Sequence, residues 1–221
     1  PWTLRCCKCW ALKIKEHVKS NHILLILASI VILAAIAYMF TAAESPEDYQ
    51  EKIETERERQ FKYIRFNVES PLTEEQKRGL QSLKFFAVDP TFRVKARLLP
   101  IEIKKVRVVP LTDGSTERYL EHSWAEFELG GKTNKVLLLQ SLSESDMRNF
   151  FLAFADQTSG KDTYGGGRYL NVRQDGKNSI TIDFNLAFNP YCAYNPDYAC
   201  PLPPKENRLE IAIPVGEKNY D

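Results

Sequence analysis

The sequence has no excess of charge of either sign, because 30 Lys and Arg residues stand against 29 Asp and Glu residues, giving a formal net charge of +1. A chain without a basic surplus has no overall field to attract a polyanion, which argues against nucleic acid as a partner. Its 221 residues suffice for one globular domain with appendages and are too few for two full domains. The sequence also contains no internal repeat.

Histidine and cysteine are scarce after residue 43. His122 is the only histidine there and lies in the strand-like RYLEHSWAEF, so neither a zinc site nor a Ser-His-Asp set is supported. Gly160 and Lys161 do not end a phosphate-binding P-loop, because Asp162 stands where that loop has Ser or Thr. We therefore predict no catalytic residue, no metal and no cofactor. The cysteines form two groups, which predicts two redox compartments: Cys6, Cys7 and Cys9, then Cys192 and Cys200.

A long charge-free run follows a basic N-terminus. Residues 1–22 carry five basic residues against one acid, and Ile23–Ala43 would span a hydrocarbon core of about 30 Å as a helix. Acidic residues follow the run, so the positive-inside rule places residues 1–22 in the cytoplasm and the rest outside. The alternative is a cleaved signal peptide, whose apolar core is usually shorter. We expect a bacterial cytoplasmic membrane, with a mitochondrial inner membrane as the alternative. Next to it, we expect lipidated or inert thiols at Cys6, Cys7 and Cys9.

We predict a stalk helix with its linker over residues 44–69. Ser45 and Pro46 are typical of a helix start, and paired charges three or four residues apart then surround a thin apolar stripe. From Lys84 onward, eight short runs rich in β-branched and aromatic residues alternate with Gly and Asp turn signals. The first two predicted strands are FFAVDP and TFRVKARLL, and the last is SITIDFNLAF. We therefore predict a mainly antiparallel β barrel or sandwich over residues 70–221, with one helical turn at Ser143–Arg148.

The segment from Asp156 to Glu217 holds the candidate sites. Cys192 and Cys200 flank an Asn-Pro-Asp turn, and outside the cytoplasm they are predicted to form a structural disulfide, with metal or redox chemistry as the alternative. The glycines between Tyr164 and Arg168 either form a nest for an anion with Arg168 or make a tight loop in which Arg168 pairs with a carboxylate such as Asp183.

Short polar residues in the same segment form a second candidate group. If they converge, their carboxylate and amide groups would bind a polar ligand, whereas separately they would cap turns with their own side chains. The residues predicted to line such a pocket are Tyr164, Arg168, Asp183, Asn185, Asn189 and Asn207.

Four stretches carry a resemblance to a known family: SPLT at Ser70–Thr73, LKFFAVDPTFRVKARL at Leu83–Leu98, FADQTSGKDTYGGGRYL at Phe154–Leu170 and DFNLAFNPYCAYNPDYACPLPPKENRL at Asp183–Leu209. The chain resembles the bacterial and archaeal family of domain of unknown function DUF1684, in its shorter form. The resemblance implies an envelope or exported β domain. It brings no catalytic residue, substrate or cofactor.

Two functions remain open. The anchor, the stalk and the absence of a nucleophile–base set favour a single-pass membrane protein acting as an accessory subunit of a larger membrane complex. Its expected partners are the lipid bilayer, through Ile23–Ala43, and other membrane subunits. The alternative is an extracytoplasmic enzyme or small polar-ligand-binding protein that uses the pocket predicted around the TYGGGR and DFN motifs.

Overall fold

The computed structural model describes residues 24–34 and 44–220. The chain divides into two compact units, one ending at Tyr49 and one beginning at Gln50 and containing every strand. Residues 24–34 are helical and their side chains are exposed. Among the described residues, no helix combines the length and the hydropathy needed to cross a membrane. The rest of the predicted span and Cys6, Cys7 and Cys9 lie outside the described residues, so the transmembrane helix stays a prediction.

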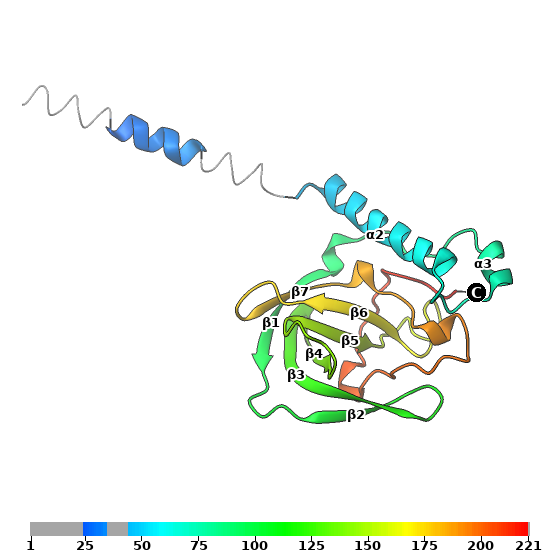
Figure 1. Ribbon diagram of the computed structural model, residues 1–221. Helices are drawn as coiled ribbons and strands as arrows, with labels where there is room; N and C mark the ends of the chain where they lie inside the picture. The colour runs from blue at the N-terminus through cyan, green and yellow to red at the C-terminus, as the bar shows by residue number, and fades with distance from the viewer. Residues whose placement is uncertain (1–23, 35–43, 221) are drawn as a thin grey trace, which may run out of the picture. The chain divides into compact units, whose positions relative to one another are not determined.

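A seven-stranded antiparallel sheet forms the centre of the second unit (Figure 1). Its strands lie in the order β6-β5-β4-β3-β1-β7, with β2 also paired to β3. A single bridge between Gln174 and Ile180 brings the two ends of this order together, so the sheet is nearly closed and barrel-like. The predicted antiparallel β class is confirmed. The strands are β1 (Arg93–Pro100), β2 (Val106–Pro110), β3 (Thr116–Leu129), β4 (Lys132–Ser141), β5 (Asn149–Phe154), β6 (Arg168–Arg173) and β7 (Ser179–Asp183).

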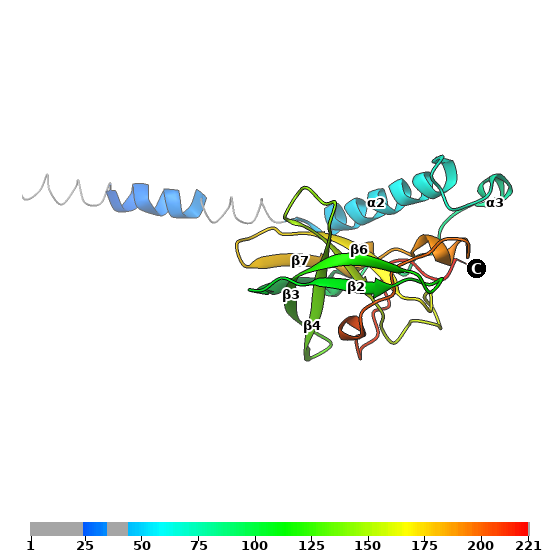
Figure 2. The same ribbon diagram turned by 60° about the horizontal axis from the view of Figure 1, so that its bottom comes forward.

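The long strand β3 organises this curvature. One of its edges pairs with β2 through Thr116–Leu120 and then with β1 through Ser123–Glu126, while its other edge pairs with β4. A register shift interrupts the β3–β4 ladder between Glu121 and Ser123, at the position of His122. A bulge of this kind bends a strand and increases its twist, which lets one strand serve both parts of a closing sheet. Figure 2 shows β2 and β3 side by side along this edge.

Alternating side chains fill the barrel. Val94, Ala96 and Leu98 on β1 are buried while the residues between them are exposed, as expected for a strand with one face on a core. The main cluster adds residues from β3 to β7 and from the C-terminal tail, including Phe184 and Ile213. At roughly 1.5–3 kcal/mol for each buried large aliphatic or aromatic side chain, this cluster is a main source of stability.

The predicted helix over residues 44–69 is present as α2 (Pro46–Phe66). Ser45 caps it, since the backbone N–H of Asp48 donates to Ser45 Oγ at 3.0 Å. From Gln50 onward α2 belongs to the same unit as the strands. Ile53 and Ile64 are buried, because the thin apolar stripe packs this part of the helix against the rest of the unit.

Two local predictions need correction. Ser143–Arg148 forms turns and no helix: Glu144 and Asp146 accept backbone N–H groups two residues ahead, at 2.8 and 3.0 Å, which competes with helical hydrogen bonding. The run 85–90 is not a strand, since Phe85 makes one bridge to Glu217 and Pro90–Phe92 is the 3-10 helix η1. A short helix, α3 (Glu74–Gly79), precedes the strands, and Thr73 begins it with a capping box to Gln76.

The tail beyond β7 crosses the barrel in short 3-10 turns and extended backbone. These turns are η2 (Phe184–Leu186), η3 (Tyr191–Ala193) and η4 (Lys205–Asn207). β4 and β5 pair at one position, Leu139 opposite Phe151, and Asn207 bridges them beyond it. Its side chain accepts from Leu137 N at 2.7 Å and donates to the carbonyls of Leu137 and Ala153 at 3.0 and 2.9 Å. The tail therefore completes the hydrogen bonding of two strands.

Candidate functional site

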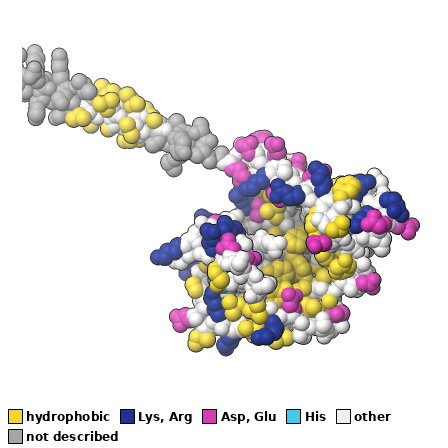
Figure 3. Space-filling model, in the orientation of Figure 1, with side chains coloured by type: hydrophobic (Ala, Val, Ile, Leu, Met, Phe, Trp, Pro, Cys, Tyr) yellow, Lys and Arg dark blue, Asp and Glu magenta, His cyan; other side chains and the backbone are white. Residues whose placement is uncertain are grey.

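A cleft of about 410 Å³ lies between α2 and the surface formed by β6 and the turns η2 and η3. Its lining is mostly apolar, and its volume is within the roughly 300–1,000 Å³ typical of small-molecule sites. Figure 3 shows apolar side chains gathered in a recessed area beside the charged surface of α2. The apolar part of the lining consists of Ile64, Leu170, Leu186 and Phe188, with the rings of Tyr63 and Tyr191.

One buried acceptor in this lining has no hydrogen-bond donor among the described residues: the side-chain oxygen Oδ1 of Asn189. Asn189 is 2% exposed. Its side-chain N–H donates to Lys218 O at 2.7 Å, which fixes the amide and determines where Oδ1 lies. A buried carbonyl-type oxygen without a donor costs roughly 1–3 kcal/mol, so this atom is suited to an N–H or O–H group brought by a ligand.

Glu217 lies directly behind the cleft and supports it. Oε2 of Glu217 accepts from Gln60 Nε2 at 2.6 Å and from the backbone N–H of Asn189 at 2.9 Å, and Tyr194 Oη donates to Oε1. Burial raises the pKa of Glu217, although these hydrogen bonds act in the opposite direction. Burial, together with the neighbouring Glu217 charge, raises the pKa of Tyr194 well above its usual value. Among the described residues of the cleft, none is placed to exchange a proton with Glu217. The Glu217 carboxylate therefore serves to orient Asn189 and Gln60.

The rim of the cleft is polar but carries little net charge. Arg59 and Glu56 pair with each other at 2.8 Å, and Arg57 donates to the carbonyl of Phe86 at 3.0 Å. The hydroxyls of Tyr63 and Tyr191 meet at 2.7 Å and join α2 to η3. The cleft thus combines an apolar body with a paired rim, and Asn189 contributes a buried oxygen that lacks a donor, so a neutral molecule fits it better than an ion.

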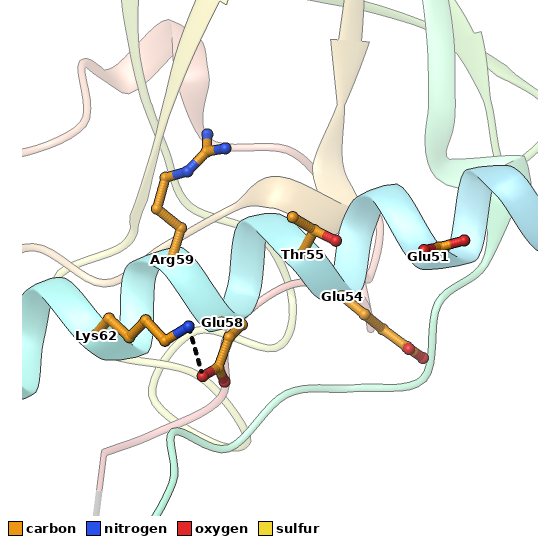
Figure 4. Close-up of a pocket in the computed structure, with 6 residues that line it drawn as sticks. All are labelled: Glu51, Glu54, Thr55, Glu58, Arg59 and Lys62. Carbon is orange, nitrogen blue, oxygen red and sulfur yellow. Dashed lines mark ion pairs between the residues drawn. The ribbon is translucent and has the colours of Figure 1, made fainter.

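The outer face of α2 offers no comparable site. Figure 4 shows the six residues that line an open pocket there, all from this one helix: Glu51, Glu54, Thr55, Glu58, Arg59 and Lys62. Glu58 and Lys62 pair at 3.4 Å with most of their side chains exposed, an arrangement worth little energy. This is the solvated charged face that the sequence predicts.

The residues predicted to line a pocket do not converge. Only Asn185 and Asn189 line the cleft. The side chain of Asn185 exchanges hydrogen bonds with the backbone of Asp89 at 2.8 and 2.9 Å, so it holds the loop before β1. Asp183 caps η2 and faces Arg93 at 4.0 Å, and Asn207 is fully buried between strands.

Arg168 has a structural position. It is 0% exposed and donates to Asp156 at 2.9 Å, to the Ile213 carbonyl at 2.8 Å and to that of Val215. The bonded carboxylate is therefore Asp156, and the suggested pairing with Asp183 is wrong. Burial lowers the pKa of Arg168, while the Asp156 charge opposes that shift. In the glycine loop, Gly167 has φ +89°, so the loop turns sharply into β6.

The predicted disulfide is not formed in the structure, where Cys192 and Cys200 are free thiols. The Asn-Pro-Asp turn does bring them together, and the backbone N–H of Cys192 donates to Cys200 Sγ at 3.1 Å. A backbone-to-sulfur hydrogen bond, and no covalent S–S bond, therefore joins the two residues. Tyr164 lies beside them, with Oη 3.6 Å from Cys192 Sγ, and takes no part in the cleft.

Sequence reasoning missed three contributors to the site: Gln60, Tyr63 and Glu217. Gln60 follows Ile53 by seven residues and precedes Ile64 by four, so it is an uncharged polar residue on the buried stripe of α2. That position was a usable signal. For Glu217, which lies in the tail, no local pattern indicates burial.

Comparison with known proteins identifies a family without assigning a function. Residues 78–218 match the family model described as protein of unknown function (DUF1684). The solution NMR structure of an uncharacterized protein from Haloarcula marismortui is 34% identical, with a TM-score of 0.62, covering 78% of this chain and 95% of that one. No curated protein matches. The resemblance drawn from the sequence motifs is confirmed, and the chain belongs to the DUF1684 family.

Proposed function

We propose that this protein is a membrane-anchored binding protein whose β domain holds a small neutral molecule in the cleft between α2 and β6. The observation that carries the proposal is the buried Oδ1 of Asn189, an acceptor without a described donor in the lining of a cleft whose body is mostly apolar. The ligand class follows from this pair of features: a compact or flat apolar body bearing one N–H or O–H donor.

Indole is a suitable probe because it has a flat apolar body and one N–H donor. Its isostere 1-benzofuran has the same shape and no donor. Titration calorimetry of the full chain in detergent is expected to show indole binding about tenfold tighter than 1-benzofuran, the worth of one hydrogen bond of about 1.4 kcal/mol. Equal affinities would show that Asn189 does not accept a hydrogen bond from the ligand, which contradicts the proposal.

A matched pair of variants locates the binding. Leu186→Trp fills the cleft with a larger ring and is expected to abolish indole binding. Thr55→Trp places the same ring on the exposed outer face of α2 (Figure 4) and should leave the affinity unchanged. Circular dichroism checks that both variants are folded. Indole binding that survives Leu186→Trp in a folded protein would contradict the proposal.

The anchored location is part of the same proposal. Apolar side chains of the helix at residues 24–34 are more than half exposed, from 54% at Leu27 to 67% at Val31, and a bilayer would cover them. This supports the charge-free run Ile23–Ala43 as the anchor. The basic residues before the run and the acidic residues after it support a β domain outside the cytoplasm. The topology can be tested by treating intact cells with a reductant, without denaturant, and then with a membrane-impermeant maleimide. Labelling of Cys6, Cys7 or Cys9 of this protein would contradict the proposed topology.

The same exposed apolar helix supports a second function, that of an accessory subunit in a membrane complex. Extraction of native membranes in mild detergent, followed by mass spectrometry of comigrating chains, tests it directly. Stoichiometric partners are expected for a subunit. A chain that migrates alone would count against this second function and leave the binding proposal intact.

A further inference from the structure

A second site lies apart from the proposed cleft, at the thiols of Cys192 and Cys200. Both residues are buried, at 8% and 5% exposure, in a cluster with Ala153 and Tyr169. The turn that begins at Asn195 folds the chain back, so that the Cys192 N–H donates to Cys200 Sγ at 3.1 Å. Two thiols eight positions apart therefore lie close together in a reduced state.

Polar groups form hydrogen bonds with this pair of cysteines. Tyr164 Oη donates to Cys192 Sγ at 3.6 Å, and the backbone N–H of Cys200 donates to Thr112 Oγ1 at 3.1 Å. Donors aimed at a sulfur stabilise its thiolate. In agreement, hydrogen bonding from Cys200 lowers the pKa of the Cys192 thiol to about 6, while the neighbouring Cys192 raises that of Cys200. The pair therefore loses its first proton more easily at Cys192 than at Cys200.

We propose that Cys192 and Cys200 form an oxidation site for small hydroperoxides, with Cys192 as the reacting thiolate and Cys200 as the resolving thiol. Geometry carries this assignment: Tyr164 Oη donates to the Cys192 sulfur at 3.6 Å, and the Cys200 sulfur lies beside it, where it accepts the Cys192 N–H. Because both thiols are buried, only a small oxidant such as hydrogen peroxide fits this proposal, whereas a bulky disulfide does not.

The reaction balances in two steps. The Cys192 thiolate attacks one oxygen of hydrogen peroxide, the O–O bond breaks, and Cys192 sulfenic acid and hydroxide form. The Cys200 thiol then attacks the sulfenic sulfur, an S–S bond forms and water leaves with the proton of Cys200. The hydroxide takes up the proton released when Cys192 ionised. In total, two thiols are oxidised to one disulfide and one peroxide is reduced to two waters.

Mass spectrometry of the full chain treated with hydrogen peroxide at pH 7 tests this proposal. Trypsin releases both thiols in the single peptide 178–205, so oxidation is expected to lower its mass by about 2 Da, reversibly with dithiothreitol. The N-terminal cysteines fall in other peptides and do not interfere. A protein isolated with this disulfide already formed, and resistant to dithiothreitol until denatured, would overturn the reversible site.

Three variants assign the roles. Cys200→Ser should stop the reaction at the sulfenic acid of Cys192, which dimedone traps, whereas Cys192→Ser should leave Cys200 at least tenfold less reactive at pH 7, where an ordinary thiol is only a few per cent ionised. Tyr164→Phe should slow oxidation of Cys192 severalfold, with Tyr198→Phe in the same region as the matched control. If dimedone labels Cys200 in Cys192→Ser as fast as it labels Cys192 in Cys200→Ser, the assignment of roles is contradicted.

Discussion

The side-chain amide of Gln60 donates a 2.6 Å hydrogen bond to Glu217, 157 residues further along the chain. The same carboxylate oxygen accepts the backbone N–H of Asn189. One buried group thus joins α2, the loop after η2 and the C-terminal tail at the base of the cleft. It follows that α2 helps to form the candidate site and does more than separate the domain from a membrane.

Replacing Glu217 by Gln is expected to change how stability depends on pH. Burial raises the pKa of Glu217 above its ordinary 4.5, so the folded state binds the proton more tightly than the unfolded state. The wild-type free energy of unfolding therefore falls as pH rises from about 4.5 through the raised folded pKa. Gln stays neutral and its N–H group can donate to Tyr194 Oη, so the variant lacks this fall. Urea unfolding from pH 4 to 8 measures both curves; parallel curves would contradict the prediction.

Removing one member of the Arg168–Asp156 pair is expected to be severe. Both side chains are 0% exposed, and Asp156 Oδ1 also accepts from Thr158 N and Ile213 N. Asp156→Ala leaves a buried guanidinium without its counter-charge, which costs about 3–5 kcal/mol of unfolding free energy. Arg97→Ala breaks the largely exposed pair with Glu126 and should cost under about 1 kcal/mol. Comparable losses in the two variants, measured by thermal unfolding, would show that burial does not set the cost.

The glycine loop contains its own control. Gly167→Ala forces a left-handed backbone at φ +89° and puts Cβ 2.5 Å from the carbonyl oxygen of Phe154, whereas Cβ on Gly165 meets only an ordinary contact at 3.6 Å. We expect Gly167→Ala to cost at least about 2 kcal/mol and Gly165→Ala to stay within about 1 kcal/mol. Denaturant midpoints of the two variants check this. Equal midpoints would mean that the loop adjusts freely.

Asn207→Ala is expected to loosen the junction of β4 and β5. It removes three hydrogen bonds and leaves buried backbone groups of Leu137 and Ala153 unpaired, at a cost of about 3 kcal/mol or more. Asn178 is exposed, so Asn178→Ala is the matched control and should be nearly neutral. Hydrogen exchange adds a local test: the Leu137 amide should lose protection in Asn207→Ala, and its persistence would contradict the bridging role.

Local patterns predicted the parts of this fold that depend on local chemistry. The alternation in TFRVKARLL identifies β1, and Ser45 with Pro46 marks the start of α2. The run FFAVDP was misread because its apolar residues meet the tail, at Phe85 opposite Glu217, and not a neighbouring strand. The apolar composition of a run indicates that its residues are buried, but it does not indicate which residues they pack against.

The candidate site shows the same limit more strongly. Asn185, Asn189 and Asn207 were identified as unusual polar residues, yet each bonds a different distant backbone segment: Asp89, Lys218 and Leu137. Nothing in the spacing of these three residues distinguishes Asn189, whose side-chain oxygen accepts no hydrogen bond from the described residues. That distinction depends on Lys218 accepting the other half of the Asn189 amide, a contact set by tertiary packing.

A crystal structure of the full chain soaked with indole shows whether the cleft holds a neutral ligand. We expect indole between α2 and β6, packed on Leu170 and Leu186, with its nitrogen about 2.9 Å from Asn189 Oδ1. Indole bound elsewhere, or a cleft in which a protein group already donates to that oxygen, would contradict it.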